Sequence, residues 1–223
     1  MKKQIYVLAL VLLAGCSAPR AAQLEPDTPK LETAAEIPVA AELYQDAPLP
    51  KEWEERVKAV KRSTYIVDFA FAPSLKAGIQ RADAIVRASA IKYQNILLGD
   101  ERYPTPWTIV TLTVNECLRG DMRPGTTVEM YAMEGWSMGD AGVAMYRSFQ
   151  FGGLPVKDKE YILCMSRADG MLPESAYKQL CGRHAMMQIL DDGEMLAYVC
   201  HEEPPETVYT MKMEEFLDRI SDA

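Results

Sequence analysis

The sequence predicts a mainly β protein, a small antiparallel barrel with peripheral helices, preceded by a flexible segment that has no fold of its own. Several stretches of the chain alternate apolar and polar residues with the two-residue period of a β-strand. They are separated by turn-forming Gly, Pro and Asp residues, without the regular strand–helix alternation that builds a parallel sheet. Helical spacing of apolar residues occurs mainly at the two ends of this block, so we expect the helices to lie outside the barrel.

The start of the chain has the pattern of a secretory leader. Two lysines precede an apolar run over residues 5–13, which is too short to span a bilayer as a helix. The run ends in Leu-Ala-Gly-Cys, with the cysteine at position 16. This pattern resembles the lipobox of bacterial lipoproteins, which implies removal of a signal peptide, residues 1–15, and attachment of diacylglycerol and a fatty acid such as palmitate to Cys16. The alternatives are a plain cleaved leader or an unusually short membrane anchor.

Residues 16–50 are predicted to form a flexible, Pro-rich tether that begins at the lipidated cysteine. The segment contains six prolines and no sustained apolar period, so it does not bury enough apolar surface to offset its ordering entropy. We expect a single folded domain over residues 51–223, held to the membrane by the lipid. The expected location is the cell envelope, facing the periplasm or the cell exterior. Ser17 fits the lipoprotein sorting pattern for the outer membrane if the host is Gram-negative.

Two short helices and a strand are expected before the barrel. Trp53, Val57 and Val60 fall at i, i+4 and i+7, which predicts a short helix. Residues 65–71 alternate and predict a strand. A serine after Pro73 offers a helix cap, and residues 74–82 carry the apolar stripe of a two-turn helix.

The barrel strands are the runs that combine alternation with β-branched or aromatic residues. Pro124-Gly125 predicts a tight turn between two of them, and Asp191-Asp192-Gly193 predicts a hairpin between a later run and residues 194–200. The predicted barrel strands cover residues 84–92, 107–118, 126–133, 159–166 and 185–190.

Three further segments are assigned by composition or spacing. Residues 135–155 are rich in glycine and have no clear period, which predicts a long loop. Residues 172–180 are compatible with a short helix. The C-terminal helix is predicted from Met213, Phe216, Leu217 and Ile220, which share one helical face, with Thr210 as its cap. The folded domain therefore has helices at both its N- and C-terminal ends.

Three short motifs resemble a known family. They are Ala-Asp-Ala-Ile-Val-Arg-Ala-Ser-Ala-Ile at 82–91, Val-Asn-Glu-Cys-Leu-Arg-Gly at 114–120 and Lys-Glu-Tyr-Ile-Leu at 159–163. In this order they resemble the N-terminal domain of tissue inhibitors of metalloproteinases and the related netrin-like modules, over roughly residues 74–200. The resemblance implies a five-stranded antiparallel OB-like barrel. Protease inhibition is not implied, because the family inhibits through a free N-terminal cysteine, whereas Cys16 is expected to be lipidated on a long tether.

The charge balance argues against nucleic acid as a partner. The leader contains two of the 24 basic residues and no acidic one, so the mature chain would carry 22 basic and 32 acidic residues, a net charge of about −10. Nucleic-acid binding requires clustered Lys and Arg to neutralise phosphates. The predicted partners are the membrane, through the lipid anchor, and an envelope protein or glycan.

The cysteines and histidines leave several possibilities open. Outside the cytoplasm four cysteines besides Cys16 permit disulfides, and Cys181 with Cys200 is one possible pair. His184 and His201 lie beside these two cysteines, so a zinc site is another possibility. Adjacent Cys200 and His201 do not readily reach one ion together, and reduced, partly buried thiols are the third interpretation. We assign no metal and no cofactor.

The predicted long loop offers a candidate contact surface. It carries Trp136, Tyr146, Phe149 and Phe151 among its glycines. Aromatic side chains on a long loop beside an OB-like barrel are a common way to build a recognition surface. These residues therefore form a possible partner-binding loop. The alternative is that the same side chains cap the open end of the barrel.

No catalytic constellation is recognisable in the sequence. There is no Gly-x-Ser-x-Gly elbow, no catalytic-cysteine signature and no phosphate-binding glycine motif. We therefore expect a membrane-anchored, extracytoplasmic lipoprotein that acts as a binding or interaction module and not as an enzyme. The alternatives are an envelope enzyme with an unrecognised site and a metalloprotease-inhibitor-like protein.

Overall fold

A computed structural model describes most of the predicted domain and the residues just before it. The described residues are 43–65, 74–100, 104–149, 153–168, 170–180, 185–191, 193–199 and 208–223. The leader, the lipidation at Cys16 and most of the predicted tether lie outside them. No helix among the described residues is long and apolar enough to cross a membrane.

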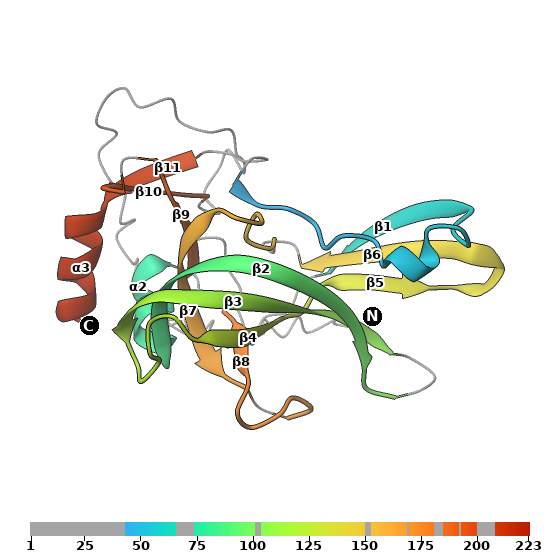
Figure 1. Cartoon of the computed structure of the whole chain (residues 1–223), viewed down its shortest axis with the longest axis horizontal. Coiled ribbons are helices and arrows are strands. Elements are labelled where there is room, and N and C mark those ends of the chain that lie inside the picture. Colours follow the sequence, from blue (N-terminus) through green and yellow to red (C-terminus); the bar gives the residue numbers. More distant parts are fainter. Residues whose placement is uncertain are drawn as a thin grey trace, which may run out of the picture.

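Strands dominate the described residues, which also form two α-helices and two short 3₁₀ turns (Figure 1). The helical elements are η1 (Lys51–Trp53), α2 (Leu75–Arg81), η2 (Asp140–Gly142) and α3 (Met213–Ser221). The strands are β1 (Ala59–Tyr65), β2 (Ala84–Leu98), β3 (Thr105–Arg119), β4 (Thr127–Ala132), β5 (Gly135–Met138), β6 (Val143–Phe149), β7 (Glu160–Arg167), β8 (Tyr177–Gln179), β9 (Met186–Ile189), β10 (Met195–Val199) and β11 (Val208–Lys212).

Five strands close into a barrel. β2 pairs antiparallel with β3 and with β7, and β3 pairs antiparallel with β4. β8 closes the ring, because it pairs in parallel with β4 and antiparallel with β7. The strand order around the barrel is β7-β2-β3-β4-β8. The predicted mainly β fold with a five-stranded OB-like barrel is therefore confirmed, although its last strand is β8 and not the predicted run over 185–190.

A second sheet segment grows from β7. The first half of β7 pairs with β9 through Tyr161–Leu163, while its second half pairs with β8. β9, β10 and β11 then follow as an antiparallel extension of the barrel sheet. Gly193 has φ +71, the left-handed conformation that a tight turn between β9 and β10 requires. The predicted hairpin is confirmed at this position.

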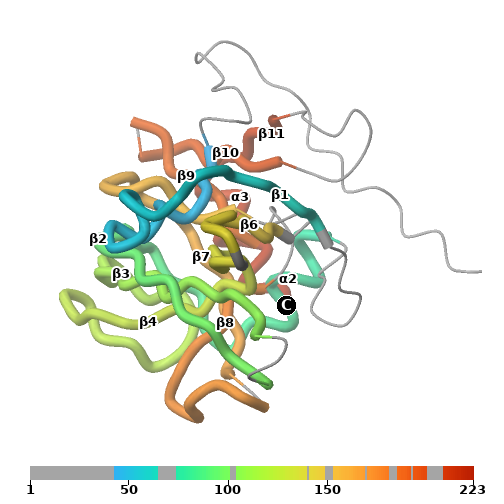
Figure 2. The backbone as a smooth tube through the Cα atoms, turned by 90° about the vertical axis from the view of Figure 1, so that its right-hand side faces the viewer, coloured from blue at the N-terminus to red at the C-terminus, as the bar shows by residue number. Residues whose placement is uncertain are grey.

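A separate three-stranded sheet lies at one end of the molecule, opposite α3 (Figure 1). β6 lies between β5, which is antiparallel to it, and β1, which is parallel. Figure 2 shows β1 and β6 side by side on the face turned to the viewer. The predicted long loop over 135–155 is therefore wrong. Its glycines serve close packing: a Cβ at Gly135 would lie 2.6 Å from Oδ1 of Asn95.

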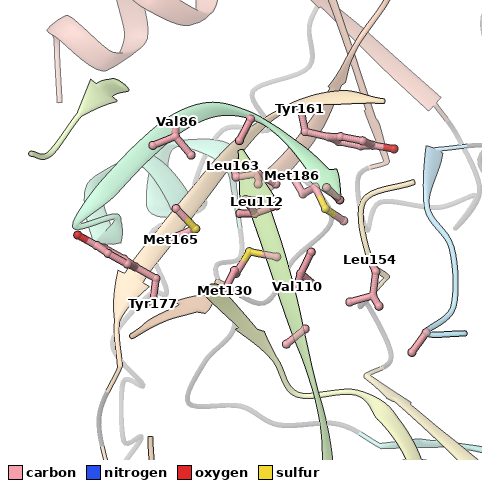
Figure 3. Packing of buried hydrophobic residues seen from close by; sticks show 14 of the residues in the cluster. Val86, Val110, Leu112, Met130, Leu154, Tyr161, Leu163, Met165, Tyr177 and Met186 are labelled. Carbon is pink, nitrogen blue, oxygen red and sulfur yellow. The ribbon is translucent and has the colours of Figure 1, made fainter. Parts of the chain in front are cut away.

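β7 is buried on both faces and separates two cores. Odd-numbered Tyr161 and Leu163 point into the barrel, where Leu112, Met130 and Met186 belong to the same packed cluster (Figure 3). Ile162 and Cys164 of β7 belong to a second core that lies under the helices and β9–β11. Strands buried on both faces have continuous apolar sequences, which explains the compact Tyr-Ile-Leu-Cys-Met run.

The two α-helices cover the second core. α2 begins as predicted, with the backbone N–H of Ala77 donating to Oγ of Ser74 at 3.2 Å. α3 buries Phe216 completely but leaves Leu217 40% exposed. The predicted cap at Thr210 is wrong, because this residue lies in β11, opposite Ala197 of β10. Pairing with β10 keeps the chain extended as far as Lys212.

Two other local predictions are wrong. The predicted helix around Trp53 is only the 3₁₀ turn η1, and Val60, 54% exposed, belongs to the exposed strand β1. The predicted helix over 172–180 is a pair of turns followed by β8. In both cases tertiary pairing overrides a weak local pattern. The strand predicted over 65–71 meets β1 only at Tyr65, and its other residues lie outside the described part of the chain.

The folded body begins before residue 51. Leu43 is fully buried and Ala47 is 3% exposed, so residues 43–50 belong to the packed domain and not to the predicted tether. We call residues 43–50 the strap. The backbone of Gln45 exchanges two hydrogen bonds with Leu154, at 3.0 and 2.9 Å. Leu43 and Ala47 pack into two of the hydrophobic clusters, so the strap is held by apolar contacts as well as by hydrogen bonds.

Candidate functional site

The residues singled out from the sequence do not meet in one site. Cys16, Cys181, Cys200 and Phe151 lie outside the described residues, as do both histidines. Phe149 is in β6, but its side chain is not described. Trp136 and Tyr146 are both buried, at 6% and 0% exposure.

Trp136 and Tyr146 hold the strap against the barrel. Their ring centroids are 4.9 Å apart, on neighbouring strands of the three-stranded sheet. The indole N–H of Trp136 donates to the carbonyl oxygen of Ala47 at 2.7 Å, and the backbone N–H of Ala47 donates to the hydroxyl of Tyr146 at 2.9 Å. A partner could not touch these rings without displacing the strap. The geometry therefore matches the alternative interpretation, in which they close one end of the barrel.

Two further tyrosines hold the strap from the other side. The hydroxyl of Tyr161 donates to the carbonyl oxygen of Leu43 at 2.8 Å and accepts from the backbone N–H of Val156 at 3.0 Å. Burial raises the pKa of Tyr161 to about 12. The hydroxyl of Tyr44 donates to the carbonyl oxygen of Met186 at 3.0 Å. The contacts to Leu43 and Met186 join residues more than one hundred positions apart, which is why sequence patterns did not reveal them.

A buried carboxylate completes this region. Glu134 is 3% exposed, and its Oε1 accepts from the backbone N–H of Gly153 at 3.1 Å. Its Oε2 accepts a longer hydrogen bond, 3.4 Å, from the hydroxyl of Tyr146. Burial, and next the charge of Glu134, raise the pKa of Tyr146 above its ordinary value. Its two partners are a buried hydroxyl and a backbone N–H of the same packed region, so we assign this carboxylate a structural role.

A surface hollow lies along the free edge of β2. β7 pairs with β2 only as far as Ser89, and no strand among the described residues continues that edge. The chain from Ala47 to Glu54 runs past it and leaves a groove of about 510 Å³. Its lining on the β2 side is Lys92, Tyr93, Gln94 and Asn95. We call this hollow the edge groove.

The edge groove opens onto the outward face of β2, β3 and β4, which we call the outer barrel face. Residues paired across strands share a face, so three rows cross it. Two of the rows are polar and the third begins with a glutamine and ends in buried apolar side chains. The rows are Ser89–Thr113–Thr127, Lys92–Thr111–Glu129 and Gln94–Ile109–Tyr131.

One end of the outer barrel face carries a fixed polar network. Arg87 donates to Oε2 of Glu160 at 2.6 Å, and the side-chain amide of Asn115 donates to Oε1 of the same carboxylate at 2.5 Å. The hydrogen bond from Arg87, and then that from Asn115, lower the pKa of Glu160, while partial burial opposes them. These hydrogen bonds connect β7 to β2 and β3 beside the polar rows.

The other end of the outer barrel face is apolar and covered. Trp107, Ile109 and Tyr131 pack under Leu172 and Ala176 of the segment before β8. The indole nitrogen of Trp107 is buried and has no hydrogen-bond partner in the described structure. Burial, and then Glu129, raise the pKa of Tyr131. The face thus changes from open and polar to closed and apolar.

The described cysteines have no ligand-like surroundings. Cys164 is buried in β7, and burial raises the pKa of its thiol to about 12. The thiol of Cys117 donates to the carbonyl oxygen of Arg119 at 3.3 Å. Both are free thiols, and no cluster of His, Cys, Asp or Glu in the described ranges could hold a metal ion. The possible Cys181–Cys200 disulfide stays a prediction.

No protein-family model matches the chain, and no curated protein matches it. The candidate site is therefore argued from the geometry of the barrel.

Proposed function

We propose that this protein is a lipid-anchored lipoprotein of the cell envelope that acts as a non-catalytic binding module for a hydroxyl-rich glycan. The edge groove is the observation that carries the binding half of the proposal. Its volume of about 510 Å³ lies within the range of about 300–1,000 Å³ typical of small-ligand sites. The corresponding outer face and loops of OB-folds are a recurrent place for oligonucleotide and oligosaccharide binding.

The chemistry of the lining favours a glycan over a charged ligand. In the edge groove two lysines, Lys51 and Lys92, are balanced by two glutamates, Glu52 and Glu54. The adjoining rows supply hydroxyl and amide groups that can donate and accept hydrogen bonds, as sugar hydroxyls do. The prolines of the strap and the ring of Tyr93 add flat apolar surface. The acidic chain, net charge −8, disfavours nucleic acid.

A binding role fits this groove better than a catalytic one. Catalytic groups work as oriented pairs within a pocket that excludes water. The four charged side chains of the edge groove are all exposed, and none of them forms an ion pair in the described structure. The half-buried amide of Asn95 is already committed, because it donates to the carbonyl oxygen of Trp136 at 2.8 Å and accepts from the backbone N–H of Trp136 at 2.6 Å.

The binding half is tested with one substitution on the groove and its match elsewhere. Gln94→Arg places a long charged side chain in the edge groove, whereas Gln80→Arg makes the same change on the exposed side of α2. We expect the purified wild-type chain to bind members of an envelope-glycan array, and Gln94→Arg to lose at least tenfold in affinity while Gln80→Arg retains it. Equal binding by both variants would show that the glycan does not bind in the edge groove.

The anchoring half rests on the leader and has its own test. Cys16→Ala should stop labelling of the protein by a palmitate analogue and release it from membranes, because the acyl chains supply the membrane affinity. Unchanged labelling would refute lipidation at this residue and would leave the groove proposal standing.

A further inference from the structure

The outer strand of the three-stranded sheet, β1, presents an unused edge. It pairs with β6 along its whole length, from Ala59 opposite Val143 to Tyr65 opposite Phe149. No described strand lies on its other side (Figure 1). A strand edge in this position offers backbone N–H and C=O groups to an incoming strand.

β1 contributes almost nothing to the core. The side chains of residues 59–64 are all exposed, on both faces of the strand, and Val60 is 54% exposed. Among the described side chains of β1, Arg62 is the one that is held in place. It forms an ion pair with Asp46 of the strap, and its guanidinium lies 5.7 Å from the ring centroid of Tyr146. Apolar burial therefore contributes little to the stability of β1, which is held in the sheet by its backbone hydrogen bonds to β6.

The charged side chains between residues 56 and 65 are all basic, and one of them, Arg62, is paired with Asp46 of the strap. Residues 56–65 contain four basic side chains and no acidic one, in a chain whose net charge is −8. Arg147 of β6 lies opposite Ser63 and so shares a sheet face with Lys61. Among the described residues, Arg56, Lys58, Lys61 and Arg147 form no ion pair.

Charged side chains on an edge strand can also serve only to protect a protein against unwanted pairing with other strands. Protection by itself requires no particular sign. The basic charge of β1 is opposite in sign to the net charge of the whole chain. Two copies of β1 repel each other because both are basic, whereas an acidic segment is attracted. The edge therefore excludes self-pairing and selects a partner at the same time.

We propose that β1 is a docking edge for an acidic, extended segment of a partner protein, which adds to the sheet as a further strand. Backbone hydrogen bonds to β1 supply affinity, and the basic side chains at 56, 58, 61 and 147 supply selectivity for Glu- and Asp-rich sequences. This surface is separate from the edge groove and does not depend on glycan binding or on lipidation.

The test uses a fluorescent nine-residue peptide of alternating glutamate and valine, titrated against the full chain and followed by anisotropy. We expect saturable binding that weakens as salt rises, because exposed charges are screened over about 10 Å at 0.1 M. A peptide with lysine for glutamate should not bind. The same acidic peptide with N-methylated backbone nitrogens along one edge should lose at least tenfold in affinity, because it cannot complete the strand ladder.

Charge reversal locates the site. Lys58→Glu with Lys61→Glu should weaken binding at least tenfold, whereas Lys157→Glu with Lys159→Glu, two exposed lysines before β7, should leave it within about twofold. Equal losses in both pairs would overturn the proposal, as would undiminished binding of the N-methylated peptide. Binding of anionic phosphatidylglycerol vesicles in place of the peptide would overturn it as well and identify a membrane contact. Self-association of the β1 variant without peptide binding would show that the charges serve protection alone.

Discussion

At the scale of single residues, hydroxyl and carboxyl groups fix the fold around the candidate site. The hydroxyl of Tyr161 links β7 to Leu43 and to Val156, so three segments depend on one oxygen atom. Its ring could be anticipated as a core side chain from the compact apolar run that it begins. Its hydrogen bonds could not, because Leu43 is 118 residues away and the predicted tether includes it.

Tyr161→Phe keeps the ring and removes this oxygen. The change should lower the free energy of unfolding by about 1–3 kcal/mol, since a buried N–H of Val156 and the carbonyl of Leu43 lose their partner. Chemical denaturation measures it. Tyr177→Phe is the matched control, because the hydroxyl of Tyr177 makes no hydrogen bond in the described structure, and this change should cost much less. Equal costs for the two variants would contradict the role given to Tyr161.

Glu160 gives the stability a defined pH dependence. Its pKa is lowered in the folded protein, so the folded state binds this proton less readily than the unfolded chain. The resulting stabilisation is complete above the unfolded pKa of a glutamate, about 4.3, and is lost as the pH falls through the lower folded value.

Glu160→Gln removes this proton-binding difference. Its unfolding free energy should fall less steeply than that of the wild type when the pH is lowered below about 5. Denaturation series from neutral to acid pH measure the slope. Glu174→Gln, at an exposed carboxylate before β8, should retain the wild-type slope. A Glu160→Gln profile parallel to the wild type would show that the Arg87–Glu160 pair adds no acid-sensitive stability.

At the scale of elements, strong periodicity was a reliable guide and glycine content was not. β2, β3 and β4 were predicted from apolar alternation and β-branched residues, and β7 was predicted from its compact apolar run. β5 and β6 were missed because Gly135, Gly139 and Gly142 break the pattern, although at Gly135 the missing side chain is what allows close packing against Asn95. A glycine needed for a close contact is indistinguishable in sequence from one in a loop.

The β5–β6 hairpin should therefore respond as a core element. Trp136→Ala and Tyr146→Ala should each lower the free energy of unfolding by about 3–5 kcal/mol, because each removes a buried ring and the hydrogen bond to Ala47. Val60→Ala, at an exposed position of β1, should change it by less than about 0.5 kcal/mol. Thermal or denaturant unfolding measures all three. If neither Trp136→Ala nor Tyr146→Ala changed the free energy of unfolding appreciably, the two rings would not be core side chains and could face a partner.

At the scale of the whole molecule, the barrel could be predicted and the candidate site could not. The five-stranded OB-like barrel follows from the strand pattern and from the three family-like motifs. The edge groove is formed by residues 47–54 and by 92–95 of β2, which neither motif nor spacing connects. The groove forms because the pairing of β7 with β2 ends at Ser89, while hydrogen bonds from Trp136 and Tyr161 hold the strap in place.

The central claim is that the edge groove holds the ligand of this protein in the cell envelope. A photoreactive amino acid placed at position 94 of the lipidated chain tests it directly, with position 80 on α2 as the control. On irradiation of intact cells, the account predicts a covalent adduct from position 94 that glycan-cleaving enzymes shorten, and none from position 80. Adducts from position 80 alone, or from neither position, would contradict it.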